Sequence, residues 1–98
     1  HDVKLNGTIG SSSKISDSKN IILDNVGSST PIKDVPIIKL DNVSNTLINN
    51  NFPFNATDIF IEANGKETKN IFLKNNVFKN VTTAVKKGTS LDKKAITE

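Results

Sequence analysis

The chain has 98 residues, which is enough for at most one small domain of marginal stability. It has no cysteine, which excludes disulfides and thiolate metal sites, and no apolar run approaches the roughly 18 residues of a membrane span. The formal net charge is +3, but all 13 basic residues are lysine, and the lack of arginine argues against a nucleic-acid partner because such recognition favours the planar guanidinium group.

The first apolar stretch, 3–9, predicts a strand in an incomplete first coil that we place at 1–20. No charged and apolar leader surrounds His1, so we expect no signal peptide within this chain. A first residue other than Met is typical of a chain that continues a longer protein or has been trimmed. His1 is the single histidine, and we assign it no catalytic role.

A repeat of 25 residues organises the rest of the chain. It aligns Leu23 with Ile48 and Leu73, in the segments 21–26, 46–52 and 71–78. A second set of short apolar runs lies between them, at 37–40, 59–62 and 83–86. Turns rich in Gly, Asn and Ser are expected at 27–30, 42–45, 64–67 and 87–90.

These features predict an all-β fold, a right-handed parallel β-helix of about three to four coils followed by a tail. A hairpin fold would need tight two-residue turns, and the Asn64-Gly65 signal is followed by four more polar residues before the next strand. We therefore expect one fragment with a partial coil at 1–20, repeated coils at 21–86 and a C-terminal tail at 87–98. In such a solenoid, equivalent residues stack about 4.8 Å apart.

The asparagines at the 25-residue period are the most informative column. Asn25, Asn50 and Asn75 would each accept a left-handed bend, and we expect their amides to form a ladder that serves the structure rather than a ligand. The aligned aliphatic side chains would stack inside. The space beyond the bend would be filled by Val26, Phe52 and Val77 or Phe78.

The residues that alternate with this inward set should face outward. They are Ile22, Leu47 and Phe72, and an apolar stripe on a free surface is unusual. We expect the C-terminal tail or a neighbouring loop to cover it. A partner chain is the alternative.

Catalytic constellations are lacking in this sequence. One histidine cannot build a Ser-His-Asp triad or a His-rich zinc site, and no Gly-rich phosphate loop occurs. The acids on or beside strands are Asp24, Asp41, Asp58 and Glu62. The repeated Leu-Asp-Asn-Val around Asp24 and Asp41 indicates a structural turn, and Glu62 is expected on the surface. We therefore predict no catalytic, cofactor-binding or metal-binding residue.

Two stretches resemble a known family. The segment from Thr57 to Asn76 looks like the last coils of glycoside hydrolase family 28, the polygalacturonase-like enzymes, and 85–96 is similar to their C-terminal tails. Pectate-lyase-like β-helices in general share this pattern. The resemblance implies a right-handed parallel β-helix that hydrolyses galacturonan or rhamnogalacturonan linkages by inversion. The family's Asn-Thr-Asp, Asp-Asp, Gly-His-Gly and Arg-Ile-Lys motifs are absent, and Ala56-Thr57-Asp58 is the nearest approach.

The resemblance suggests the C-terminal structural coils of a secreted or periplasmic, pectin-directed glycoside hydrolase. The catalytic acids would lie upstream, so that this segment alone is inactive, without a cofactor. Its partners would be the preceding coils and a pectin-like polysaccharide. Residues 91–98 would cap the open edge of the solenoid, and without such a cap the edge would pair with further copies of the chain. The alternatives are a non-catalytic β-helix interaction module, as in adhesins or phage fibres, and a carbohydrate-binding domain, which the lack of Trp and Tyr disfavours.

Overall fold

The computed structural model describes residues 2–9, 13–28, 30–92 and 94–97, and within these ranges the chain is all β. Predictions for His1, Ser29, Lys93 and Glu98 fall outside them. The strands are β1 (Val3–Ile9), β2 (Ser13–Ser28), β3 (Pro36–Asn49), β4 (Thr57–Asn64), β5 (Lys69–Lys74), β6 (Val81–Lys87) and β7 (Ile96–Thr97). None of the described residues belongs to a helix that could cross a membrane.

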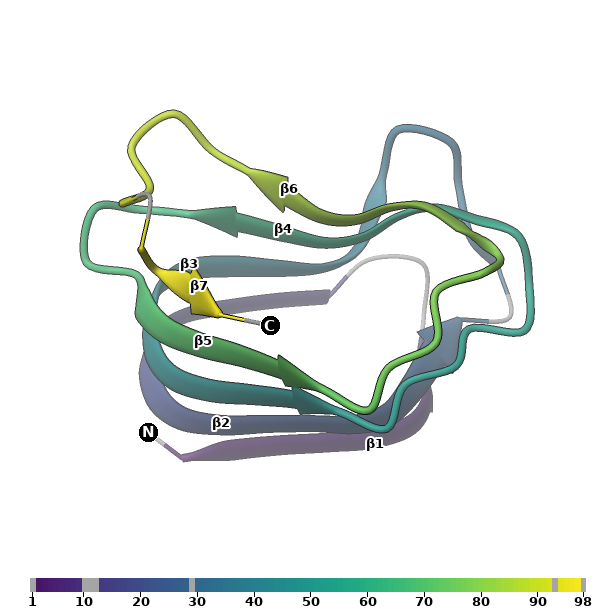
Figure 1. Ribbon diagram of the computed structural model, residues 1–98, viewed down its shortest axis with the longest axis horizontal. Coiled ribbons are helices and arrows are strands. Elements are labelled where there is room, and N and C mark those ends of the chain that lie inside the picture. Colours follow the sequence, from purple (N-terminus) through teal and green to yellow (C-terminus); the bar gives the residue numbers. More distant parts are fainter. Residues whose placement is uncertain (1, 10–12, 29, 93, 98) are drawn as a thin grey trace.

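The strands wind into a right-handed parallel solenoid of about three turns, as the repeat predicted (Figure 1). Each turn contributes one strand to a lower wall, made of 3–9, 21–28, 44–49, 69–74 and 96–97, and one to an upper wall, made of 13–19, 36–42, 57–64 and 81–87. Both β2 and β3 bend at a corner and so serve both walls. Every strand pair among the described residues is parallel.

The predicted register is confirmed in the lower wall. Leu23 pairs with Ile48 and Ile48 with Leu73, which is an offset of 25 residues at each step. The upper wall carries the second set of runs, where Ile38 pairs with Ile61 and Ile61 with Val85. Polar residues 13–19 form an upper-wall strand that we did not predict, because Ile15 is the single apolar residue there.

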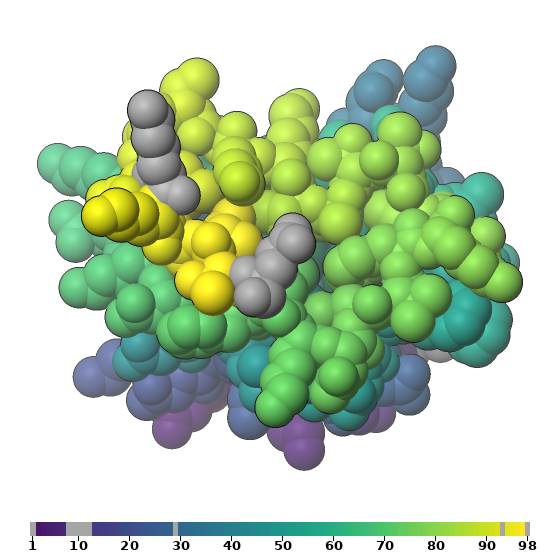
Figure 2. Space-filling model, viewed as in Figure 1, coloured from purple at the N-terminus to yellow at the C-terminus, as the bar shows by residue number. Residues whose placement is uncertain are grey.

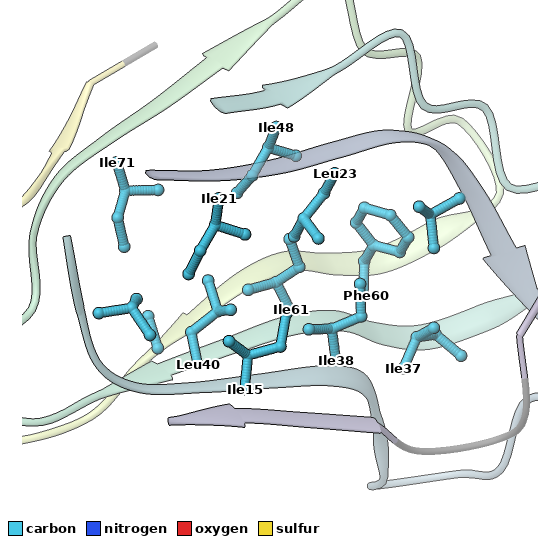
Figure 3. Close-up of a cluster of buried hydrophobic side chains, with 13 residues drawn as sticks. Ile15, Ile21, Leu23, Ile37, Ile38, Leu40, Ile48, Phe60, Ile61 and Ile71 are labelled. Carbon is cyan, nitrogen blue, oxygen red and sulfur yellow. The ribbon is translucent and has the colours of Figure 1, made fainter. Parts of the chain in front are cut away.

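The core is a thin layer of aliphatic side chains between the two walls (Figure 3). Inward and outward side chains alternate along the lower-wall strands, and Ile21 and Leu23 there meet Leu40 and Ile61 of the upper wall, all four buried. Few large residues are needed because each coil buries only one thin layer of side chains, and these layers stack on those of the neighbouring coils.

Asparagines with positive φ turn the corners. Asn25, Asn50 and Asn75 have φ values of 53°, 55° and 57°, which confirms the predicted left-handed bend. A second column at the opposite corner, Asn20, Asn45 and Asn70, adopts the same conformation at φ values of 59°, 54° and 55°. We did not predict this second column. Residues 42–45, which we expected to form a turn between strands, lie within the bent β3.

The buried amide ladder is displaced by one residue from the predicted column. Asn51, which is 1% exposed, accepts from the Val26 backbone nitrogen at 2.7 Å and donates to the Leu23 carbonyl oxygen at 3.2 Å. It also donates to Oδ1 of Asn76 at 2.9 Å, and Asn76 donates to the Ile48 carbonyl oxygen at 2.8 Å. No side-chain hydrogen bond joins the predicted column Asn25–Asn50–Asn75 in the described residues.

The prediction of which side chains fill the space beyond the asparagine bend is correct in part. Val26 is buried, and Phe78 packs against Phe60 with ring centroids 5.4 Å apart. Phe52 is only half-buried and Val77 is 46% exposed, because Asn51 and not Phe52 occupies the position equivalent to Val26.

The C-terminal tail caps one end of the solenoid, as expected. The Ala95 carbonyl oxygen accepts from the Ile71 backbone nitrogen at 2.8 Å, and β7 adds to the edge of β5. Ala95 is buried, and Leu91 and Ile96 pack against the core. Figure 2 shows this tail in yellow across the end that faces the viewer.

Candidate binding surfaces

An apolar stripe runs along the outer face of the lower wall. The pairing register places Ile22 beside Leu47 and Leu47 beside Phe72, as predicted. Ile22 is 40% exposed, Phe72 is 46% exposed and Leu47 is half-buried. The stripe faces outward because its members alternate with the buried column of Ile21, Thr46 and Ile71.

The expected cover by the C-terminal tail is wrong. Ile96 pairs with Ile71 and Thr97 with Phe72, so β7 extends the wall by one rung and does not fold over its outer face. The tail therefore closes the end of the core and leaves the stripe uncovered among the described residues.

Polar columns flank the stripe on both sides. On one side an amide ladder climbs from Asp2, where Asn20 donates to Asp2 at 3.0 Å, Asn45 to Asn20 at 3.4 Å and Asn70 to Asn45 at 3.2 Å. On the other side the register aligns three further polar residues, Asp24, Asn49 and Lys74. The outer face is thus a flat, repeating surface with an apolar centre and hydrogen-bonding edges.

The upper wall carries a charged column that the sequence analysis did not recognise. Glu62 lies between Lys39 and Lys86 in the register, with its carboxylate oxygens 3.8 Å and 3.9 Å from the two lysine nitrogens. Asn64 also donates to Glu62 at 2.9 Å. Glu62 is on the surface as expected, but it has partners. The 25-residue period does not align them with it, because the upper-wall strands pair at shorter offsets. At these distances the ion pairs contribute little to stability.

Two of the remaining strand acids, Asp24 and Asp58, accept hydrogen bonds that link neighbouring coils. Asp24 accepts from the side chains of Asn6 at 3.3 Å and Asn50 at 3.4 Å, and Asp58 accepts from the Asp34 backbone nitrogen at 2.7 Å. Asp41 is half-buried, and Thr57 donates to the Asn55 carbonyl oxygen. Within the described ranges, no three His, Cys, Asp or Glu side chains converge as metal ligands would.

A pair of stacked phenyl rings marks the corner between β3 and β4. The rings of Phe52 and Phe54 lie 4.8 Å apart and within 8° of parallel, and Phe54 is 79% exposed. The Lys79 ammonium lies 5.5 Å from the centroid of the Phe52 ring. We did not predict this pair, because Phe52 was assigned to the space beyond the bend and Phe54 to no element, although the Phe-Pro-Phe run signals two rings close together.

A hollow of about 680 Å³ opens at the capped end, between β5, β6 and the tail. It is lined by Leu73, Phe78, Val85 and Ile96 together with polar residues such as Thr83 and Lys87. Among the described residues β6 pairs with β4 alone, so its outer edge has no partner strand in the part of the chain that the structure describes. This hollow is the top of the core that the short β7 leaves partly open.

The arrangement defines a class of protein, the parallel β-solenoids. Comparison with protein-family models, with curated proteins and with solved structures found no match to this chain. The resemblance to family 28 glycoside hydrolases therefore stays a prediction.

Proposed function

We propose that these coils are a non-catalytic, polysaccharide-contacting part of a secreted or periplasmic β-helix protein directed at pectin-like galacturonan. Hydrolysis would belong to preceding coils, which would pair with the free edges of β1 and of residues 13–18. The support for this proposal is the resemblance of 57–76 and 85–96 to polygalacturonase-like C-terminal coils, together with a fold of the kind that the resemblance implies.

The proposed binding of polysaccharide rests on one observation, the uncovered stripe of Ile22, Leu47 and Phe72 between polar columns. A sugar ring has apolar C–H faces and a rim of hydroxyls, so it needs an apolar floor with hydrogen-bonding groups at the sides. The stripe repeats at the strand spacing of about 4.8 Å, and a repeating surface suits a repeating ligand. The net charge of +3 favours an acidic polysaccharide over a neutral one.

Titration of the labelled protein with a short oligogalacturonate, followed by NMR, tests this proposal. We expect shifts along the outer face of the lower wall, and at least about tenfold weaker binding in the double variant Ile22→Ser/Phe72→Ser. The matched control is Ile32→Ser, since Ile32 is 50% exposed but lies outside the lower wall. Binding that the double variant leaves unchanged would overturn the proposal.

The same stripe also suits contact between chains, which is the alternative function as an interaction module. Sedimentation analysis of the same variants separates the two. Polysaccharide binding predicts an unchanged assembly state in Ile22→Ser/Phe72→Ser, whereas an interaction module predicts an oligomer that the double variant dissociates.

A further inference from the structure

The phenyl corner, defined as Phe52, Phe54 and the hollow beside them, is built to hold one aromatic face towards solvent. An exposed phenylalanine on a connection usually gains nothing from being ordered. Here Phe54 stacks on Phe52, while the buried Pro53 between them fixes the local backbone. Asn80 of the next coil donates to the carbonyl oxygens of Pro53 at 3.3 Å and Phe54 at 3.1 Å. The platform is therefore pinned by two coils.

Hydrogen-bonding groups surround the hollow next to these rings. It measures about 240 Å³ and is lined by Gly7, Asn25, Val26, Gly27, Ser28, Phe52, Phe54 and Asn55. Asn55 donates to the Ser28 carbonyl oxygen at 2.9 Å, which fixes its amide. Its Oδ1, like the side chain of the exposed Asn25, has no hydrogen bond to other described residues. These groups are available to a ligand.

Two glycines keep the hollow open. A Cβ built on Gly7 or Gly27 would meet no atom of the described residues within 4 Å. Gly7 has a φ of +94°, which itself favours glycine, but Gly27 has no such backbone requirement. A side chain at position 27 would therefore extend into free space without displacing the backbone.

We infer that the phenyl corner binds a single pyranose ring, stacked on the exposed face of Phe54, with its hydroxyls bonded to the amides of Asn25 and Asn55. The aromatic face, the amide rim and a volume below the roughly 300 Å³ of drug-sized pockets all suit one sugar ring. None of the described residues that line the hollow is charged, so we expect a neutral hexose to bind as well as a uronic acid. This site is separate from the outer face of the lower wall and needs no acidic polymer.

NMR titration with methyl galactopyranoside and with its uronate tests this site. We expect the amide signals of Gly27, Ser28 and Phe54 to shift with both sugars, with similar millimolar affinities that reflect the small contact area. Phe54→Ala removes the stacking face and should weaken binding at least about tenfold. Gly27→Val fills the hollow and should abolish binding, while the spectrum of the core stays that of the wild type.

Ile32→Ala is the control, because it removes another exposed apolar side chain that lies outside both the hollow and the lower wall. It should leave monosaccharide binding unchanged. Shifts that persist in both Phe54→Ala and Gly27→Val, or an absence of shifts at high millimolar sugar, would overturn the inference. Monosaccharide binding at the phenyl corner does not depend on the stripe. The stripe variants therefore test only the proposed function, and the variants at Phe54 and Gly27 test only this inference.

Discussion

Two buried threonines show how much a single hydroxyl depends on its partners. Thr46 and Thr68 are both fully buried. Thr68 Oγ1 donates to the Asn64 carbonyl oxygen at 2.6 Å and accepts from the Val43 backbone nitrogen at 3.2 Å. Thr46 lies between Ile21 and Ile71 in an apolar column, and its Oγ1 has no partner among the described residues. One hydroxyl links two coils, and the other costs stability.

Replacement by valine, which keeps the shape, should therefore act in opposite directions. We expect Thr46→Val to raise the free energy of unfolding by about 1 kcal/mol, because it removes an unpaired buried polar group. Thr68→Val should lower it by about 1–2 kcal/mol, because it leaves a backbone donor and acceptor unpaired. Urea denaturation of the two variants measures both changes, provided that the dependence of the unfolding free energy on urea concentration, the m-value, stays the same. Equal destabilisation by both variants would contradict this assignment of partners.

The asparagine columns mark the limit of sequence-based prediction at this scale. The 25-residue period correctly predicted the left-handed bends at Asn25, Asn50 and Asn75. The same period is present one residue later, where Asn51 and Asn76 follow the bend and point into the core. Periodicity alone cannot distinguish neighbouring columns. Which of two consecutive asparagines faces inward is decided by the local turn of the backbone.

At the scale of elements, the tail shows how the pairing register of a short strand decides which of its side chains are buried. Its role as a cap was predictable because Leu91 and Ile96 are apolar and follow the last strand. The register of β7 was not predictable, because a shift of one residue would have turned the Ile96 side chain outward. Pairing of Ile96 with Ile71 sets this tail above the inward column. The stripe stays exposed because β7 adds to the edge of the wall and does not cross its outer face.

Ile96→Ser tests the cap. We expect a loss of about 1–2 kcal/mol in unfolding free energy, because a half-buried isoleucine leaves the core. Concentration-dependent association should also increase, since the exposed end of a sheet promotes pairing with other chains. Thr97→Ser is the control, as Thr97 is exposed in the same short strand. Chemical denaturation and light scattering provide the two readouts. Identical behaviour of both variants would mean that β7 does not close the core.

At the scale of the whole molecule, a low content of large side chains and a solenoid fold belong together. Only 35% of residues are hydrophobic, yet the buried core is continuous through successive coils because each layer is shared with its neighbours. The fold class was predictable because it depends on period, which the sequence shows directly. The phenyl corner was not, because it depends on how one connection packs on the next coil.

The central claim is that residues 25 apart lie side by side in parallel strands, and nuclear Overhauser effects between backbone protons test it most directly. We predict contacts that link 21–24 with 46–49 and 46–49 with 71–74 at a constant offset of 25. Antiparallel pairing would give partners whose residue numbers have a constant sum. That pattern, or the absence of any contact between Leu23 and Ile48, would contradict the parallel solenoid.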